Sequence, residues 1–501
     1  YPSAKPHMGH AYTSIIADFF ARFKRMDGFD VHFLTGTDEH GLKIQRAAEK
    51  KGLEPLKFCD DISQTFRNLS KTLNLSNTDF IRTTEERHKK TVQYLWSELQ
   101  KNGDIYLSKY SGWYSVSDEA FYSKEEISEK NGHKISISSG STVDWIEEES
   151  YFFRLSKWQD RLLEYYEKNP EFISPQSKKN EVISFVKGGL KDLSISRKAF
   201  SWGIKVPENP DHVIYVWLDA LTNYISALNY PDTNDDLFKN FWPASVHLIG
   251  KDILRFHAVY WPSFLMAAKI PLPKKIYGHG WILSGEEKMS KSKGNILDPL
   301  DIIETYGLDP LRYYLIKEVS FGSDGNISQD RLEDCINSDL ANNYGNLCQR
   351  VTAFTEKNCS SKVPLPAEFN DEDLVILNRF TENLTSLRNE IDQQNINFYI
   401  NFIVSSLFEA NKYFNDQEPW KKKNDKERLN TIVYTSLEVI RKISIMLYPI
   451  IPNSIKNALT IFNIKTKDIT FESIGLHDYL KPGDTINKIG ILFKKIEKKN
   501  D

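Results

Sequence analysis

Two short motifs of cationic and polar residues, far apart in the chain, constrain its fold more than any other feature. The first is an H-x-G-H pattern at residues 7–10, directly before a predicted helix. The second is K-M-S-K-S at residues 288–292, in a loop with glycine at both ends. The N-terminus of a helix and a lysine-rich loop can both bind phosphate groups. A capping turn or a solvated charge run explains either motif alone, but the pair predicts activation of a carboxylate by ATP.

The first fifty residues alternate helix, strand and helix patterns. Apolar side chains recur at helical spacing from Ile15 to Met26, and Gly28 ends that helix. Residues 31–35 predict a short buried strand, residues 36–41 a polar turn, and the following residues a helix to about Lys51. Ligands of doubly wound α/β folds lie beyond the carboxyl ends of the strands. Four candidate residues fall at such ends: His7, His10, Asp38 and His40.

The α/β rhythm is interrupted and then resumes. From residue 109 the pattern changes to short strands and turns, rich in serine and glutamate. The rhythm returns with predicted strands at 213–217, 245–249 and 275–283 and predicted helices at 218–228 and 253–269. We therefore expect an α/β, doubly wound parallel (Rossmann-like) sheet in residues 1–108 and 215–283, split by an α+β insertion at 109–214. Helical periodicity then predicts an all-α bundle over residues 343–501.

Composition argues against a strongly basic nucleic-acid-binding protein, a disulfide-rich protein and a membrane protein. The chain has 65 basic and 68 acidic residues, so any surface that binds nucleic acid must be a local patch. None of the four cysteines forms a C-x-x-C pair, which predicts a reducing, cytoplasmic location without a disulfide framework. No apolar run approaches the length of a membrane span, so no membrane partner is expected.

Aromatic and acidic residues near the predicted strand ends suggest a ligand pocket. His257 and Trp261 are four residues apart and share one helix face, and Trp217 joins a strand to a helix. With Tyr1 and Tyr224 they would supply aromatic walls that suit a thioether. Asp38 is a candidate partner for a substrate ammonium. The alternative readings are a plain aromatic core and aspartates that bond their own backbone.

Taken together, the motifs resemble those of class I aminoacyl-tRNA synthetases, and among these the methionyl-tRNA synthetase family, along nearly the whole chain. The resemblance rests on the two signature motifs and on G-T-D-E-H-G at 36–41, V-W-L-D-A at 216–220, I-G-K-D-I at 249–253, N-L-C-Q-R at 346–350 and Pro419-Trp420. It implies two steps. ATP activates methionine as methionyl-adenylate, and the methionyl group then passes to the terminal adenosine of tRNA(Met).

The resemblance also implies residue roles. The catalytic groups would be His7, His10, Lys288 and Lys291. ATP, used with Mg²⁺, would be bound by His7, Gly9, His10, Gly250, Asp252, His279 and Lys291. The methionine site would consist of Tyr1, Asp38, Trp217, Ala220, Tyr224, Ile253, His257 and Trp261, with Arg197 nearby. The anticodon would be read by Asn346, Arg350 and Trp420, and residues 284–342 would hold the K-M-S-K-S loop and contact the tRNA stem.

The sequence departs from the family pattern in the insertion, where relatives carry zinc-binding cysteine pairs. Ser115 and Asp118 stand at two of those cysteine positions, and no cysteine lies in the region. Because serine is a poor zinc ligand, we expect a knuckle without structural zinc and no other metal site. The family's optional dimerisation module has no counterpart, so a monomer is expected.

Three alternatives stay open at this stage. Synthetases for leucine, isoleucine or valine share the core but need a larger editing insertion, and a cysteinyl enzyme needs zinc-binding cysteines. A non-catalytic tRNA-binding paralogue would be expected to lose the phosphate-binding motifs. A small nucleotidylyltransferase also uses H-x-G-H but has no need of the helical bundle.

Overall fold

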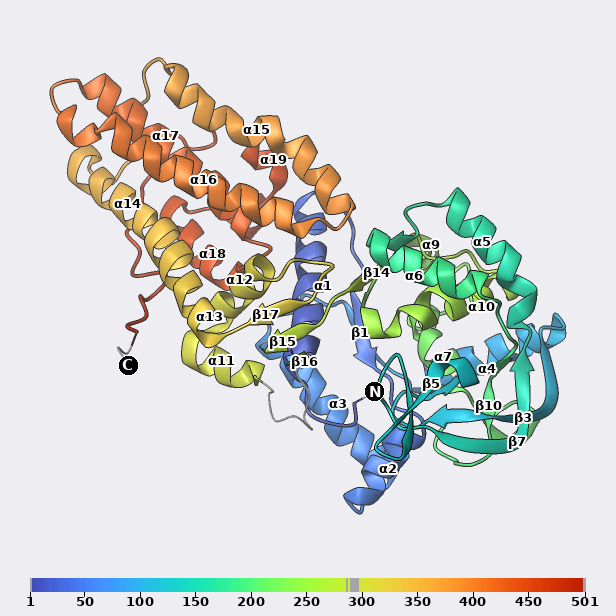
Figure 1. The fold of residues 1–501 in the computed structure, drawn as a ribbon. Coiled ribbons are helices and arrows are strands. Elements are labelled where there is room, and N and C mark those ends of the chain that lie inside the picture. Colours follow the sequence, from blue (N-terminus) through green and yellow to red (C-terminus); the bar gives the residue numbers. More distant parts are fainter. Residues whose placement is uncertain (1, 285–286, 289–296, 499–501) are drawn as a thin grey trace. The chain divides into compact units, whose positions relative to one another are not determined.

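The computed structural model describes residues 2–284, 287–288 and 297–498, and the chain forms two compact units (Figure 1). The first contains residues 32–280 and the short segment before residue 7. The second contains residues 7–31 and the chain from residue 281 onward. The helix that follows H-x-G-H therefore belongs to the same unit as the C-terminal helices.

Two small parallel sheets in the first unit have helices between their strands. Strand β1 (Leu34–Thr37) pairs in parallel with β2 (Asp79–Arg82), and α2 (Leu42–Lys50) and α3 (Pro55–Thr72) connect them. A second parallel sheet has β14 (Ile276–His279) between β13 (His247–Gly250) and β8 (Ile173–Ser174). The helices of this unit include α4 (Glu86–Lys101), α5 (Gln159–Lys168), α6 (Gln176–Lys187), α8 (Asn223–Ser226), α9 (Asp236–Phe241) and α10 (Trp261–Ala267).

Three predicted strands have different bounds. The first begins at Leu34 rather than at residue 31. The predicted strand 213–217 is wrong at its end: β12 (Asn209–Ile214) stops and α7 (Val216–Leu221) begins, so Trp217 is helical. The predicted strand 275–283 is two strands, because β14 pairs with β13 whereas β15 (Ile282–Ser284) pairs with β17 (Gly325–Ile327). Short apolar runs do not reveal such breaks, since buried strands and buried helices look alike.

The strands of the insertion are longer than the sequence pattern predicts. Strands β3 (Ile105–Ser115) and β7 (Asp144–Phe153) form an antiparallel ribbon at the centre of a sheet with β4 (Ala120–Tyr122) and β9 (Leu193–Ser194). Aromatic residues pair across it: Trp113 lies opposite Trp145, with ring centroids 5.1 Å apart. Such cross-strand pairs stabilise an antiparallel ribbon. Strands β5 (Ile127–Lys130) and β6 (His133–Ser136) add a hairpin, and β10 (Ser196–Arg197) and β11 (Lys205–Val206) flank β12.

The second unit is mainly helical, which confirms the predicted bundle. Its long helices α14 (Asn346–Cys359), α15 (Asp371–Asp392), α16 (Ile396–Gln417) and α17 (Lys426–Leu447) lie side by side (Figure 1). The fully buried Asp373 crosslinks α15, α16 and α17, since its carboxylate accepts hydrogen bonds from Arg428 of α17 at 2.7 and 2.9 Å and from Tyr413 of α16. A buried carboxylate held in this way avoids the desolvation cost of an unpaired charge.

The helix α1 (Met8–Met26) is part of the same core. Its Phe19 and Phe23 rings contact the Tyr399 ring of α16 at 5.3 and 5.5 Å. Its buried Asp18 accepts a 2.7 Å hydrogen bond from Arg312 of α12 (Leu308–Glu318). The unit also includes α11 (Pro299–Tyr306), α13 (Gln329–Cys335), α18 (Pro452–Ala458), α19 (Phe471–Ile474) and β16 (Glu287–Lys288), which pairs with β15.

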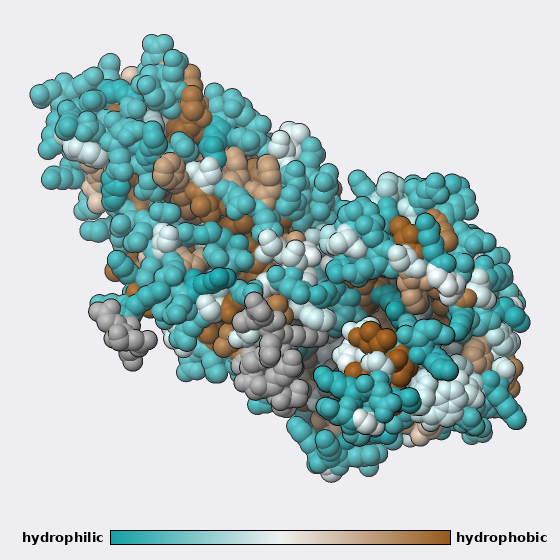
Figure 2. Space-filling view, viewed as in Figure 1, coloured by the Kyte–Doolittle hydropathy of each residue, from teal (hydrophilic) through white to brown (hydrophobic). Residues whose placement is uncertain are grey.

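The surface in Figure 2 is predominantly hydrophilic, with separate apolar patches. Exposed apolar side chains include Val375 and Phe408 of the helical bundle. Within the described part of the chain, no helix is long and apolar enough to cross a membrane. The two units do not test the finer four-part domain division, which stays a prediction.

Candidate active site

The H-x-G-H motif forms the capped start of α1. His7 accepts a hydrogen bond at Nδ1 from the backbone N–H of Gly9, at 3.0 Å, and His10 Nδ1 accepts one from the backbone N–H of His7, at 3.1 Å. The two rings stack with centroids 3.9 Å apart. A Cβ at Gly9 would lie 2.9 Å from the His7 ring, so glycine is required for this packing. Burial, and to a smaller extent the neighbouring His7, lower the pKa of His10 to about 3.

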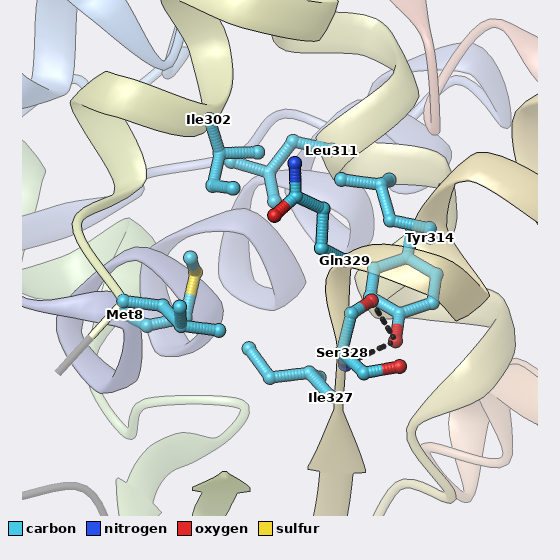
Figure 3. Close-up of a pocket in the computed structure, with 9 residues that line it drawn as sticks. Met8, Ile302, Leu311, Tyr314, Ile327, Ser328 and Gln329 are labelled. Carbon is cyan, nitrogen blue, oxygen red and sulfur yellow. Dashed lines mark hydrogen bonds between the residues drawn. The ribbon is translucent and has the colours of Figure 1, made fainter. Parts of the chain in front are cut away.

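The side chain of Met8, inside the H-x-G-H motif, packs into an apolar pocket. This side chain, 1% exposed, lines the pocket with Ile302 of α11, Leu311 of α12 and Ile327 of β17 (Figure 3). The hydroxyl of Tyr314 and the backbone of Ser328 are hydrogen-bonded at its edge. None of the described residues that line this pocket carries a carboxylate or an amine, so the pocket fixes the start of α1 by apolar packing and does not suit a charged substrate.

Parts of two predicted sites lie outside the described residues. Lys291 and Tyr1 both lie outside the described residues. Lys288 is placed by its backbone in β16, opposite Leu283 of β15. The roles of these three residues are therefore untested.

The three residues expected to contact adenosine come together in the first unit. Gly250 and His279 lie opposite each other at the carboxyl ends of the parallel strands β13 and β14. The carboxylate of Asp252 lies so close to Gly250 that a Cβ there would be 2.6 Å from its Oδ1. Burial lowers the pKa of His279, and its Nδ1 bonds the Gly280 carbonyl at 2.8 Å, so the ring is neutral and fixed.

Beside this edge, aromatic rings and imidazoles form a layer. The His257 Nδ1–H donates to the Ile253 carbonyl at 2.9 Å, so Nε2 accepts from the Tyr224 hydroxyl at 2.7 Å. Burial lowers the pKa of His257 to about 4, which keeps it neutral at pH 7. Trp261 Nε1–H donates to His247 Nε2 at 3.2 Å, and His247 stacks on Tyr224 with centroids 3.9 Å apart. The layer is therefore uncharged and rigid.

A π-helical turn, Phe256–Tyr260, precedes α10 and carries His257. It places Phe256 flat against Trp217 of α7, with centroids 3.9 Å apart. Trp217 also meets the His257 ring edge to face at 6.1 Å, and Ala220 lies one turn further along α7. Single π-helical turns inside helices are frequent at functional sites. The turn thus joins α7 to the aromatic layer.

Asp38 lies in the turn after β1. Burial raises the pKa of the Tyr224 phenol, and the nearby charge of Asp38 raises that pKa further. Burial raises the pKa of Asp38 itself, and the carboxylate of Asp219 raises it further. Gly41 ends the turn with a φ of +113°, a conformation that favours glycine. A carboxylate beside an uncharged aromatic layer suits a small zwitterion with an apolar side chain.

The predicted anticodon residues come together on the helical bundle. Asn346 begins α14 and Arg350 lies one turn later on the same face. Arg350 donates to Asn415 at 2.6 Å and lies over the Phe414 ring at 5.3 Å. Phe414 in turn meets Trp420 edge to face at 5.9 Å, and the Trp420 side chain is 40% exposed. An exposed indole that packs edge to face on Phe414 is suited to stacking a base.

In the insertion, Asp118 and several hydroxyl groups form a hydrogen-bonded cluster. The Asp118 carboxylate accepts from Tyr122 at 2.6 Å, Ser139 at 2.5 Å and Ser141 at 2.8 Å, while Ser115 Oγ accepts from the Asp118 backbone at 3.1 Å. Among the described residues, no group of three or more His, Cys, Asp or Glu side chains could hold a metal ion. The donors present do not fit zinc, which prefers thiolate and imidazole.

Comparison with known proteins decides the family. Residues 1–352 match the family described as tRNA synthetases class I (M), and residues 363–501 match the anticodon binding domain of methionyl tRNA ligase. The methionine–tRNA ligase of Brucella suis is 50% identical over 95% of this chain and 92% of that protein. The enzyme of Rickettsia felis is 50% identical over 99% of this chain and 97% of that protein. This chain belongs to the methionine–tRNA ligase family.

Solved structures of the methionine–tRNA ligase family agree. Mycobacterium tuberculosis methionyl-tRNA synthetase in complex with methionyl-adenylate is 45% identical, with a TM-score of 0.96 over 98% of this chain and 97% of that one. The apo form of the same enzyme gives a TM-score of 0.90 at 42% identity. The class I catalytic part and the helical part expected from the resemblance are thus both present.

Some residues at the site were missed by the sequence analysis. Phe256 and His247 complete the aromatic layer, and His88 contacts the Asp219 carboxylate. The sequence could have identified His88, because this residue shares the apolar face of α4 with Val92 and Leu99. A histidine on that face is a polar group at a core position. Arg197 is also buried, with its guanidinium 4.3 Å from the Phe121 ring and 4.7 Å from the Tyr215 ring.

Proposed function

We propose that the residues gathered in the first unit, together with the H-x-G-H and K-M-S-K-S motifs, carry out methionine activation, and that the helical bundle reads the tRNA. The family fixes the reaction: a methionine–tRNA ligase uses ATP to form methionyl-adenylate and then charges tRNA. What supports the assignment of residues is the uncharged layer around His257, next to the Asp38 carboxylate on one side and the Gly250 strand edge on the other.

Methionine binding follows from the chemistry of that layer. Asp38 pairs with the substrate ammonium. Trp217, Ala220, Tyr224, Ile253, His257 and Trp261 enclose the side chain, with Tyr1 completing the site. Sulfur–aromatic contacts favour a thioether over a branched alkyl group in such a pocket. A neutral His257, held by Ile253 and Tyr224, adds polarity without a charge that would have to be desolvated.

Activation requires in-line attack of the methionine carboxylate on the α-phosphorus of ATP, with release of pyrophosphate. Gly250, Asp252 and His279 bind the adenosine. His7, Gly9 and His10 bind phosphate oxygens at the start of α1, and Lys288 and Lys291 neutralise the leaving pyrophosphate. Mg²⁺ accompanies ATP. Catalysis is then positioning and charge stabilisation, without a covalent enzyme intermediate.

In the second step a ribose hydroxyl of the terminal tRNA adenosine attacks the adenylate carbonyl and AMP leaves. We propose that Asn346, Arg350 and Trp420 read the anticodon of tRNA(Met). The region 284–342 contacts the tRNA stem. A doubly wound catalytic sheet split at 109–214, a monomeric state and a cytoplasmic location complete the proposal.

Pyrophosphate exchange tests the amino-acid assignment. Exchange should be fastest with methionine, and Asp38→Asn should raise the KM for methionine because the ammonium loses its counter-charge. Lys291→Ala should lower adenylate formation by roughly 10²-fold through loss of a transition-state contact. Faster exchange with leucine or glutamate than with methionine would refute the assignment. A chain that binds tRNA but exchanges no amino acid would be the non-catalytic paralogue.

The zinc-free insertion has its own test. Elemental analysis of the purified protein should find no stoichiometric zinc, because Asp118 and the serines satisfy one another by hydrogen bonds. One zinc per chain would show that the cluster rearranges around a metal.

A further inference from the structure

Three buried side chains of the first unit form a bridge that the proposed reaction does not use. The Asp219 carboxylate of α7 lies between two imidazoles, with Oδ2 2.7 Å from His40 Nδ1 and Oδ1 2.7 Å from His88 Nε2. Asp219 is 1% exposed, His40 3% and His88 0%. We call His40, Asp219 and His88 the imidazole bridge.

The protons of the bridge can be assigned. Burial alone would raise the pKa of Asp219, but His40 and His88 outweigh it and lower that pKa, so Asp219 is a carboxylate. A carboxylate only accepts hydrogen bonds, so His40 donates its Nδ1–H and His88 its Nε2–H. The second nitrogen of His88 lies 2.8 Å from the Ser226 hydroxyl oxygen, within hydrogen-bond distance. Asp219 thus fixes a proton on Nδ1 of His40 and a proton on Nε2 of His88.

The bridge joins segments that carry substrate-binding residues. His40 is two residues after Asp38 in the turn that follows β1. Asp219 lies in α7 between Trp217 and Ala220, and Ser226 lies in α8 two residues after Tyr224. His88 comes from α4, which supplies no proposed substrate contact. The ammonium side and the side-chain side of the methionine site are therefore tied to one carboxylate.

The bridge also affects charge. Asp38 and Asp219 are two acidic groups in one buried region, and each ionised carboxylate disfavours the other. The two imidazole N–H groups that point at Asp219 offset its negative charge. This matters because Asp38, in the same region, must stay ionised to hold an ammonium group. An apolar replacement of the same shape would fill the space without this effect.

From this geometry we infer that His40, Asp219 and His88 are positioning residues for methionine, holding the Asp38 turn at a fixed distance from the α7 and α8 walls. The inference rests on the proposed methionine site. It assigns the bridge a specific effect on amino-acid binding, beyond general stability of the fold.

Matched amide substitutions of the two histidines test this inference. The side-chain N–H of an asparagine reaches the position of a histidine Nδ1, and the side-chain N–H of a glutamine reaches the position of a histidine Nε2. His40→Asn and His88→Gln keep a donor toward Asp219, whereas His40→Gln and His88→Asn misplace it. In pyrophosphate exchange, the misplacing pair should raise the KM for methionine on the order of tenfold, with the KM for ATP unchanged. The donor-keeping pair should stay within about twofold of the parent chain.

Asp219→Asn provides a second measurement, since it keeps the shape but accepts only one of the two N–H groups. Its KM for methionine should also rise, and its melting temperature should fall less than that of Asp219→Ala. If both members of each pair lower stability alike and leave the KM for methionine unchanged, the bridge is only structural and the inference fails. Absence of methionine exchange in the parent chain would instead refute the proposed site itself.

Discussion

Gly250 occupies a position where a single methyl group would displace a carboxylate. A Cβ there would lie 2.6 Å from Asp252 Oδ1, well inside contact distance. Gly250→Ala should therefore move Asp252 and raise the KM for ATP on the order of tenfold, equivalent to about 1.4 kcal/mol. The KM for methionine should change little. Both constants are measured by pyrophosphate exchange.

Gly278→Ala is the matched control on the neighbouring strand. Its added Cβ would meet Leu254 Cδ1 at 3.4 Å, an ordinary contact, so the variant should behave like the parent chain. Equal effects of the two substitutions would mean that Gly250 is needed for strand packing and not for Asp252.

Trp420 is the exposed end of a chain of contacts that runs through Phe414 to Arg350. Trp420→Ala should leave methionine activation unchanged and weaken tRNA charging by about 1–3 kcal/mol, the usual value of one stacked base. Comparing pyrophosphate exchange with aminoacylation separates the steps. Phe408→Ala, which removes another exposed ring of the bundle, should affect neither. A parallel loss of both activities in Trp420→Ala would contradict an anticodon role.

At the residue scale, the motifs predicted some members of the aromatic layer and missed others. His257, Trp261 and Tyr224 were expected from their spacing and from the family, and the structure brings them into one layer. His247 and Phe256 were not, because a buried ring looks like any core residue in a sequence. What fixes an imidazole tautomer is a partner from another element, and sequence spacing does not show that partner.

Among the elements, the π-helical turn before α10 places a neutral histidine in the core. The pKa of His257 is about 4 against an ordinary value of 6.5, so the unfolded chain binds this proton more tightly than the folded one. Stability is then full above pH 6.5 and falls as pH decreases toward 4, by about 3 kcal/mol for this group. His257→Gln should lose this part of the pH dependence. Urea unfolding followed by tryptophan fluorescence between pH 4 and 7.5 measures it.

His133→Gln is the control, because His133 is exposed in the β5–β6 hairpin and its replacement should leave the pH dependence as in the parent chain. The prediction fails if His257→Gln and His133→Gln give the same profile.

Element types were predictable where the apolar period was long, as in α1 and α15 to α17. Element ends were not. Trp217 became helical because the Asp219 backbone N–H bonds the Tyr215 carbonyl and opens α7 there. The strand after residue 275 was cut in two because its halves pair with strands from different parts of the chain. The second outcome depends on tertiary partners that a local window does not contain.

For the whole molecule, the least predictable feature is that α1 shares its core with helices from the far end of the chain. Arg312, fully buried, joins Asp18 of α1 at 2.7 Å to the carbonyl groups of Pro449 at 3.2 Å and Ile450 at 2.8 Å. Ending the chain at residue 342 would remove those carbonyls and the Tyr399 ring. The truncated protein should therefore melt at a lower temperature and also lose methionine activation, because α1 carries His7 and His10.

A pair of substitutions in α16 tests the same coupling in the full chain. Tyr399→Ala removes a buried ring that contacts Phe19 and Phe23, and it should destabilise the second unit by about 3–5 kcal/mol and slow pyrophosphate exchange. Phe408→Ala, on the exposed side of the same helix, should do neither. Since Trp420→Ala is expected to spare activation, a loss in Tyr399→Ala would be due to packing under α1 and not to tRNA recognition. Normal activation by the chain ending at 342 would show instead that the start of α1 is held without the bundle.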